Sequence, residues 1–282
     1  MTNIETFDYN MSIQQKLDSI IRKNNSLISI GLDSEISKLP KHLQKNGNAQ
    51  FEFNKTIIDA THDLVCAYKP NSAFYEAQGE EGIHQLKLTC DYIHEKYPEI
   101  FTILDAKRAD IGSTNEGYVK FAFDWLGVDS ITLQPYLGHE ALRPFLDRSD
   151  KGNIILCKTS NKGSGEFQNL KIDGKELYKI VAESVSQTWN KNNNCFLVTG
   201  ATYPEELSKI RQIVGDMTFL VPGIGAQGGD VEKTVKAGLN SKKAGMIINS
   251  SRGIIFASKG IDFAERAREE AMKLRDEINK YR

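Results

Sequence analysis

The sequence contains little that would mark a membrane or secreted protein. No apolar run in the 282 residues approaches the ~20 consecutive residues of a membrane span. Residues 1–10 are polar, and they show neither the basic and then apolar order of a secretion signal nor an Arg-rich transit pattern. We therefore predict a cytoplasmic protein with no membrane partner.

The sequence also has no large excess of either positive or negative charge. The 36 basic and 37 acidic residues give a net charge of −1, so no overall field attracts nucleic acid or an anionic lipid surface. We predict no nucleic-acid partner. Any affinity for an anion must come from a local cluster of cations.

Metal-binding and disulfide patterns are missing as well. The four cysteines form no Cys-x-x-Cys pair, and the five histidines form no His-Glu-x-x-His motif. Cys66, Cys157 and Cys195 lie inside apolar runs, where a small buried thiol is the more frequent role. No serine or cysteine lies in a nucleophile-elbow setting. The sequence predicts no metal, no cofactor and a reducing environment.

Linkers and low-complexity tracts are absent too, and 40% hydrophobic with 26% charged residues is an ordinary globular composition. We expect residues 1–282 to form a single domain. At this length we also expect no second, fused enzyme domain.

What the sequence does contain is a repeated pattern. Short apolar runs rich in β-branched residues end in polar or Gly-containing tips, and a helical pattern follows them. Eight such runs occur, at residues 27–33, 64–70, 100–107, 130–135, 153–160, 194–201, 217–223 and 245–251.

Amphipathic helical patterns lie between these runs, at residues 50–64, 81–97, 113–126, 174–189, 203–214 and 230–239. Eight alternating units predict an α/β fold, a (β/α)8 TIM barrel, with an extra N-terminal helix around residues 12–24. A doubly wound parallel sheet is the alternative. In a barrel, the active site lies at the C-terminal ends of the strands.

The densest group of charged residues is ILDAKRADIGST, residues 103–114. Asp105 and Lys107 are two residues apart on a predicted strand, so they should point to the same side, with Asp110 in the loop beyond. Lys69 ends an earlier strand and could extend the array. A lysine between carboxylates stays protonated and can donate a proton. A surface cluster of ion pairs is the alternative.

A second motif, VPGIGAQGGD, satisfies Gly-x-Gly-x-x-Gly with Gly223, Gly225 and Gly228. A dinucleotide fingerprint carries an acidic residue about 20 positions later, but residues 241–260 contain no Asp or Glu. A phosphate site after the seventh barrel strand, completed by Arg252, fits the pattern better than dinucleotide binding or a structural turn.

These segments together resemble the orotidine 5′-phosphate decarboxylase family, in its longer, bacterial-type subgroup. LDAKRADIGST matches that family's signature, and the likeness extends along nearly the whole chain. The other matching segments, in the expected order, are GLD, YKPNSAFYE, QPYLG, KTSNKGS, GATYPEEL, VPGIGAQGGD and SSRGI.

The resemblance implies roles for matching positions. Lys69, Asp105, Lys107 and Asp110 would form the charged catalytic network. Lys107 would deliver a proton to C6 of the pyrimidine, and Asp105 would lie beside the substrate carboxylate. Asp110 would reach into the partner's site, which makes the active unit a homodimer.

The same resemblance implies a set of substrate-binding residues. Asp33 and Asn71 would serve the ribose, as would Thr114 from the partner chain, and Ser160 would bond the pyrimidine edge. Gln227 and Arg252 would bind phosphate. The full predicted set is Asp33, Asn71, Ile111, Thr114, Ser160, Pro222, Gly225, Gln227 and Arg252.

The expected activity is the decarboxylation of orotidine 5′-monophosphate to uridine 5′-monophosphate, the last step of de novo pyrimidine nucleotide synthesis, in a stand-alone carboxy-lyase. One alternative is a metal-dependent sugar-phosphate decarboxylase of the same barrel superfamily. The other is a noncatalytic barrel that binds a phosphate ligand. Residues 159–170 we expect to be a lid over the site.

Overall fold

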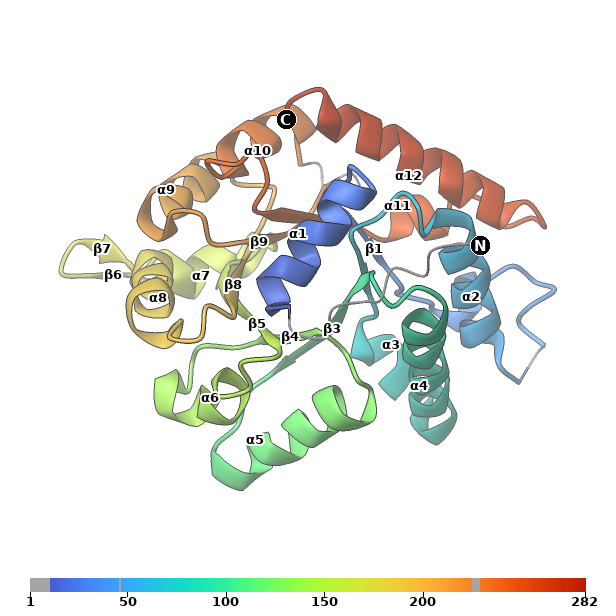
Figure 1. Cartoon of the computed structure of the whole chain (residues 1–282), viewed down its shortest axis with the longest axis horizontal. Coiled ribbons are helices and arrows are strands. Elements are labelled where there is room, and N and C mark those ends of the chain that lie inside the picture. Colours follow the sequence, from blue (N-terminus) through green and yellow to red (C-terminus); the bar gives the residue numbers. More distant parts are fainter. Residues whose placement is uncertain (1–10, 46, 225–228) are drawn as a thin grey trace.

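The computed structural model describes residues 11–45, 47–224 and 229–282. Within them, eight parallel strands close into a barrel in the order β1-β10-β9-β8-β5-β4-β3-β2 (Figure 1). Closure confirms the predicted (β/α)8 barrel over the doubly wound alternative. The barrel strands are β1 (Ile28–Gly31), β2 (Ala67–Lys69), β3 (Phe101–Arg108), β4 (Ser130–Leu133), β5 (Gly152–Lys158), β8 (Cys195–Thr199), β9 (Phe219–Pro222) and β10 (Met246–Ser250).

Helices surround this barrel, and the predicted extra N-terminal helix is present as α1 (Ile13–Lys23). The outer helices are α2 (Ala49–Thr61), α3 (Ser72–Glu76), α4 (Gly79–Lys96), α5 (Gly112–Val119), α6 (Gly138–Leu146), α7 (Gly165–Gln168), α8 (Leu177–Ser184), α9 (Pro204–Val214), α10 (Val231–Gly238), α11 (Arg252–Ile255) and α12 (Phe263–Asn279). α5 and α8 continue as π-helical turns, Lys120–Trp125 and Val185–Trp189. No helix in the described residues is both long and apolar enough to span a bilayer.

Three small elements complete the described chain. Short 3₁₀ turns occur at Ile36–Lys38 and Lys162–Ser164. A small antiparallel hairpin, β6 (Lys171–Ile172) with β7 (Lys175–Glu176), projects beside α8 at the periphery of the barrel (Figure 1). This hairpin has no local sequence signal, because each of its strands has only two residues and no apolar alternation.

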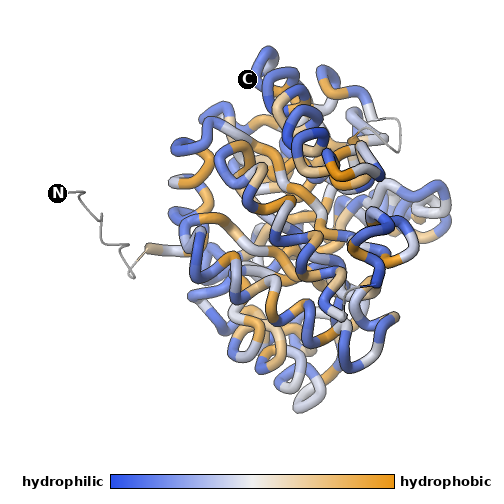
Figure 2. The backbone as a smooth tube through the Cα atoms, turned by 90° about the vertical axis from the view of Figure 1, so that its right-hand side faces the viewer, coloured by the Kyte–Doolittle hydropathy of each residue, from blue (hydrophilic) through white to orange (hydrophobic). Residues whose placement is uncertain are grey.

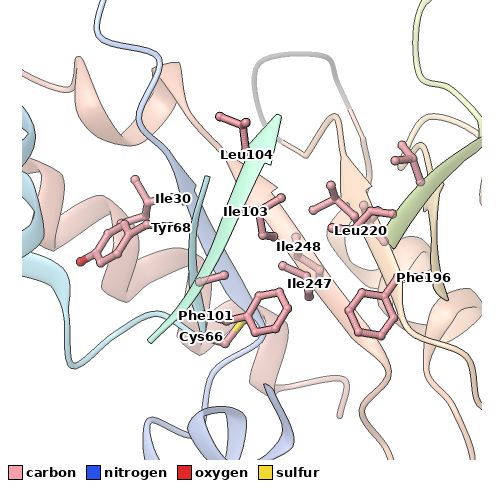
Figure 3. Close-up of a cluster of buried hydrophobic side chains, with 14 of the residues drawn as sticks. Ile30, Cys66, Tyr68, Phe101, Ile103, Leu104, Phe196, Leu220, Ile247 and Ile248 are labelled. Atoms are coloured by element: carbon pink, nitrogen blue, oxygen red, sulfur yellow. The ribbon is translucent and has the colours of Figure 1, made fainter. Parts of the chain in front are cut away.

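The barrel strands are almost entirely buried, as their near-continuous apolar runs predict. Hydrophobic residues concentrate inside the molecule and polar ones on its outside (Figure 2). Phe101 of β3 and Phe196 of β8 have ring centroids 6.2 Å apart (Figure 3). Since these two strands are not neighbours in the barrel, their rings meet across its interior, which is a packed core.

All four cysteines are buried and free; burial was predicted for Cys66, Cys157 and Cys195. Burial raises the pKa of the Cys66 thiol to about 12, mainly because the thiolate would lose its hydration. The same effect raises the pKa of the Cys157 thiol to about 12. These thiols therefore stay protonated and behave as small apolar side chains.

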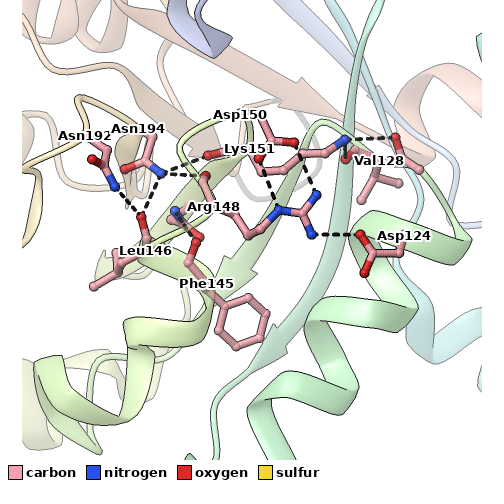
Figure 4. A network of polar contacts seen from close by, with 11 residues as sticks. Asp124, Val128, Phe145, Leu146, Arg148, Asp150, Lys151, Asn192 and Asn194 are labelled. Atoms are coloured by element: carbon pink, nitrogen blue, oxygen red, sulfur yellow. Dashed lines mark hydrogen bonds and ion pairs between the residues drawn. The ribbon is translucent and has the colours of Figure 1, made fainter.

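The N-terminal end of the barrel is closed by α1, which crosses it in Figure 1. Ser12 and Gln15 form a capping box that starts this helix. Lys16 of α1 donates from Nζ to both oxygens of Asp129, at 2.7 and 2.8 Å, just before β4. Nearby, Lys151 donates to the carbonyl of Val128 (Figure 4). A polar layer thus ties helix and strands together here.

Candidate active site

At the opposite, C-terminal end of the strands lies a cavity of about 540 Å³. Side chains from the C-terminal ends of all eight barrel strands, or from the residues just after them, converge on it, as the barrel fold predicts. The predicted site residues that line it are Asp33, Lys69, Asn71, Asp105, Lys107, Ser160, Pro222 and Arg252. The fold therefore brings together residues that are up to about 220 positions apart in the sequence.

Three predicted residues do not line this cavity. Asp110 lies in the loop after β3 and accepts a hydrogen bond at Oδ1 from the backbone N–H of Ile111, at 2.7 Å. Ile111 is 61% exposed, and Thr114 is exposed on α5. Gly225 and Gln227 lie outside the described residues.

The centre of the cavity is a chain of three charged side chains. Lys69 Nζ donates to Asp105 Oδ2 at 2.8 Å, and Lys107 Nζ donates to Asp105 Oδ1 at 2.5 Å. Each carboxylate oxygen therefore faces one ammonium group. Lys69 is 4% exposed as a side chain, whereas Lys107 is 45% exposed and opens onto the cavity.

This arrangement keeps the groups ionised. Burial opposes the charge of Asp105, but Lys69 and Lys107 outweigh it and hold the pKa of Asp105 far below its usual range. Burial also opposes the charge of Lys69, and there the attraction of Asp105 and Asp33 prevails and raises the pKa of Lys69. The centre thus carries fixed opposite charges at neutral pH, as the residue pattern predicted.

The route by which Asp105 and Lys107 meet differs from the prediction. We expected regular strand alternation, but Lys107 has a φ of +47°. The register between β3 and β4 also shifts, since Leu104 pairs with Ile131 and Arg108 pairs with Leu133. Four steps on β3 therefore oppose two on β4. A bulge, rather than the two-residue period, turns Lys107 back onto Asp105.

Asp33 and Asn71 lie beside this charged chain. Asp33 Oδ1 is buried and accepts no hydrogen bond from the described residues. Asn71 forms a β-bridge with Asp105 and caps α3 through Oδ1, which accepts from Ala73 N at 3.2 Å. An unpartnered buried carboxylate oxygen is an acceptor ready for a ligand hydroxyl.

The other wall of the cavity comes from β9 and β10. Gly223 has a φ of +103°, and Ile224 forms a β-bridge with Gly229. Arg252 is exposed at the start of α11 and makes no ion pair within the part of the chain that the structure describes. Its guanidinium is available to an anionic ligand.

The close approach of this wall to β1 requires a glycine. A Cβ on Gly31 would lie 1.9 Å from Ser251 Oγ, well inside van der Waals contact. The Gly31 position in the GLD segment therefore allows the chain carrying Arg252 to pass close to β1.

The predicted lid, residues 159–170, contains short helices, the 3₁₀ turn and α7. Thr159 and Gln168 exchange two hydrogen bonds, at 2.9 and 2.8 Å. Buried Lys158 donates to Asn169 Oδ1 at 2.8 Å. Because Ser160 lies between these anchors, the segment holds it at the cavity wall. Whether the segment moves as a lid stays a prediction.

Sequence reasoning missed part of the cavity lining. Gln134, just after β4, lines the cavity, and Thr132 lies two residues earlier on the strand, so the strand period could have placed Thr132 on the inner face. The other described lining residues that it missed are Asn161, Gln168, Asn249, Ser250, Ser251, Leu156, Val198, Leu220 and Ile224. Four of these are apolar and give the cavity a partly apolar wall. In the described residues, no three His, Cys, Asp or Glu side chains gather as a metal site.

Comparisons with known proteins identify the family to which this chain is similar. A sequence model described as "Orotidine 5'-phosphate decarboxylase / HUMPS family" matches residues 26–267. A protein of Ralstonia pickettii named orotidine 5′-phosphate decarboxylase is 48% identical over 238 residues, which is 84% of this chain and 87% of that protein.

Solved structures give the same result. The structure of Leishmania donovani OMP decarboxylase has a TM-score of 0.84 at 38% identity, covering 96% of this chain and 99% of the other. The structure of Leishmania donovani UMP synthase has a TM-score of 0.86 at 39% identity. That match covers 96% of this chain but 57% of the synthase, so this chain spans little more than half of that protein.

Proposed function

The chain belongs to the orotidine 5′-phosphate decarboxylase / HUMPS family, and on that premise we propose that it converts orotidine 5′-monophosphate into uridine 5′-monophosphate and carbon dioxide. It is then a carboxy-lyase of pyrimidine nucleotide synthesis. It works as a single barrel domain in the cytoplasm, without a metal or cofactor.

The observation that carries this proposal is the Lys69, Asp105 and Lys107 chain at the mouth of the barrel. Loss of carbon dioxide breaks the bond between C6 and the carboxylate carbon, and the electron pair stays on C6. Without an electron sink, charges fixed in advance must stabilise this centre. The Lys107 ammonium, fixed 2.5 Å from Asp105 Oδ1 and 45% exposed to the cavity, is such a charge.

Lys107 also supplies the proton. Its Nζ–H transfers to C6 as the bond to the carboxylate breaks, which leaves a neutral amine and a C6–H bond. Asp105 lies beside the substrate carboxylate and keeps Lys107 oriented, while buried Lys69 balances the charge of Asp105. Proton donation from a positioned group contributes about 10²- to 10⁴-fold to a rate.

Binding is divided between the two walls of the cavity. Asp33 and Asn71 contact the ribose, Ser160 bonds the pyrimidine edge, and Pro222 flanks the base. Arg252, with Gly225 and Gln227, binds the phosphate. Because the phosphate is remote from the reacting bond, its binding free energy can be used to hold the base at Lys107.

Among the described cavity-lining residues, the carboxylates are Asp33 and Asp105, and Asp105 already faces two lysines. A divalent metal needs oxygen ligands that are not occupied by ammonium groups. This donor set favours the metal-free decarboxylase over the sugar-phosphate enzyme. The Lys69, Asp105 and Lys107 chain likewise favours an enzyme over a noncatalytic barrel.

The test follows the loss of orotidine 5′-monophosphate absorbance in EDTA. Wild type should turn over, and Lys107→Ala should lose at least about 10³-fold in kcat. Lys120→Ala, at an exposed position on the helix after β3, is the matched control and should match wild type. No turnover by wild type, or equal turnover by Lys107→Ala, would contradict the proposal, and dependence on added magnesium would point to the sugar-phosphate enzyme.

We also propose a homodimer whose sites are completed across the interface by Asp110, Ile111 and Thr114. Support comes from their position outside the chain's own cavity. Exposed apolar side chains also lie near the ends of β3 and β4: Ile111 at 61%, Tyr136 at 89% and Leu137 at 46%. Such a patch suits a partner subunit.

Subunit mixing tests the shared site. Lys107→Ala mixed with Asp110→Ala should regain activity, because one site of the mixed dimer contains both native residues. Lys107→Ala mixed with Asp105→Ala is the control and should stay inactive, since those residues serve the same chain's site. No recovery in the first mixture, after exchange is verified, contradicts a shared site.

A further inference from the structure

The bulge in β3 leaves one backbone group in need of a partner. Residues between Leu104 and Arg108 have no counterparts in the β4 register, and Lys107 lies among them at a φ of +47°. A left-handed backbone is uncommon for a residue with a Cβ, and it persists only when the surroundings hold it. The Lys107 N–H donates to Thr132 Oγ1 at 2.9 Å.

The same hydroxyl reaches the catalytic carboxylate. Thr132 Oγ1 lies 2.9 Å from Asp105 Oδ1. A hydroxyl has one proton, and because Thr132 Oγ1 accepts from the Lys107 N–H, its own proton is free for the carboxylate, which can only accept. The direction of both hydrogen bonds is therefore determined.

These contacts form a closed ring. Lys107 N–H donates to Thr132, Thr132 O–H donates to Asp105 Oδ1, and Lys107 Nζ donates to the same oxygen at 2.5 Å. Lys107 is thus held at its backbone and at its ammonium by groups that Thr132 connects. Thr132 is 1% exposed on β4, so its rotamer is confined by the barrel.

We propose that Thr132 is a positioning residue of the decarboxylase, whose hydroxyl fixes both the Asp105 carboxylate and the left-handed backbone of Lys107. The proposal rests on the proposed function. It adds a residue that does not transfer a proton, yet determines where the proton donor lies. Without the hydroxyl, the Lys107 N–H loses its acceptor and Asp105 Oδ1 keeps only Lys107 Nζ.

The barrel contains a matched control at its other end. Thr102, also 1% exposed, has its hydroxyl 3.0 Å from Asp129 Oδ2 and accepts from Asp129 N at 2.9 Å. This pair has the same chemistry as Thr132 and Asp105, but it lies beneath α1 and lines no part of the cavity. Removing each hydroxyl costs similar hydrogen bonds, and only one removal should affect the reaction.

The test compares Thr132→Val, Thr132→Ser and Thr102→Val. Valine keeps the shape of threonine without the hydroxyl, and serine keeps the hydroxyl. We expect Thr132→Val to lower kcat by about 10- to 100-fold with KM within about threefold, since a hydrogen bond to a charged group is lost. Thr132→Ser should recover kcat to within about threefold of wild type. Thr102→Val should keep kcat within about twofold despite a lower unfolding midpoint.

Four kinetic results would overturn the proposal. Wild-type kcat in Thr132→Val, equal loss in Thr132→Ser, or equal loss in Thr102→Val overturns the proposal. A rise in KM with unchanged kcat does so too, because it would indicate a substrate contact. If Thr132→Val does not fold, Thr132→Ala replaces it.

A crystal structure of the Thr132→Val variant separates this proposal from the proposed function. The expected change is a Lys107 backbone that leaves the left-handed region, with Lys107 Nζ displaced from Asp105 Oδ1. An unchanged ring geometry overturns the proposal even if wild type is an active decarboxylase. If wild type is inactive on orotidine 5′-monophosphate, the proposed function fails, and this structural readout still decides the role of Thr132.

Discussion

The two ends of the barrel contain the same chemical parts in different settings. At the C-terminal end, Asp105 contacts Lys69, Lys107 and Thr132 around a cavity. At the N-terminal end, Asp129 contacts Lys16 and Thr102 beneath α1.

The two carboxylates differ in how many cations they face and in whether one of those cations is exposed. Asp129 faces Lys16 with both oxygens, and the hydroxyl and backbone of Thr102 also donate to it. Asp105 faces two lysines, one of which is 45% exposed to the cavity. The one-to-one ion pair of Lys16 and Asp129 stabilises the N-terminal end of the barrel. At the other end, two lysines share one carboxylate, so the exposed Lys107 can also interact with a ligand.

Neutralising the two aspartates should give the largest contrast. Asp105→Asn is expected to lower kcat/KM by at least about 100-fold, because Lys107 loses its fixed counter-charge. Asp129→Asn should keep kcat/KM within about threefold but lower the free energy of unfolding by about 3 kcal/mol, since it breaks a largely buried pair. Steady-state kinetics and urea unfolding check both. Equal kinetic losses in the two variants would contradict the division between the ends.

A pair of arginines sharpens the same contrast. Arg252→Ala should raise KM by about 10- to 100-fold by removing a charged contact to phosphate, with the unfolding midpoint unchanged. Arg252→Lys should recover this in part, because it keeps the charge but not the planar fork.

The second arginine of this comparison is Arg211, at the N-terminal end of the barrel, and its variant is Arg211→Ala. The Arg211 guanidinium donates to the carbonyls of Gly215, Met217, Gly238 and Gly245 and stacks 3.8 Å from the Phe219 ring centroid. It should lose at least about 2 kcal/mol of stability with KM unchanged. A stability loss in Arg252→Ala would contradict the assignment.

Acid should reduce the contribution of Asp105 to the free energy of unfolding. The pKa of Asp105 is lowered in the folded state from an ordinary value of 3.8, because Lys69 and Lys107 outweigh its burial. Its stabilising contribution is therefore present above about pH 3.8 and is lost as the pH falls below it. The stability gap between wild type and Asp105→Asn, measured by urea unfolding, should shrink as the pH falls from 6 to about 3. A stability difference between wild type and Asp105→Asn that increases as the pH falls would contradict this prediction.

The smallest effect is expected at Lys151, in the polar layer near α1. Burial lowers the pKa of Lys151 despite the attraction of Asp129 and Asp150, so its charge is poorly compensated. Lys151→Met should change the free energy of unfolding by under about 1 kcal/mol, because an apolar side chain avoids that desolvation cost. Urea unfolding measures this, with Lys16→Met as the more damaging comparison. A loss above 2 kcal/mol would mean that Lys151 is a structural partner like Lys16.

Much of the fold could be predicted because its signals are local. Eight apolar runs with helical patterns between them predicted the barrel, and the pattern at residues 12–24 predicted α1. The β6–β7 hairpin was missed, since two-residue strands carry no period. Of the predicted site residues, eight line the cavity, Asp110, Ile111 and Thr114 do not, and Gly225 and Gln227 lie outside the described residues.

The sequence by itself determined the element order, the chemistry at the strand ends and the likeness to one family, because periodicity and residue type are written along the chain. Only the tertiary structure decided that Lys107 adopts a left-handed backbone and that Thr132 bridges it to Asp105. A register shift between two strands depends on how both pack in the closed barrel. That packing is a property of residues far apart in sequence, and no local pattern encodes it.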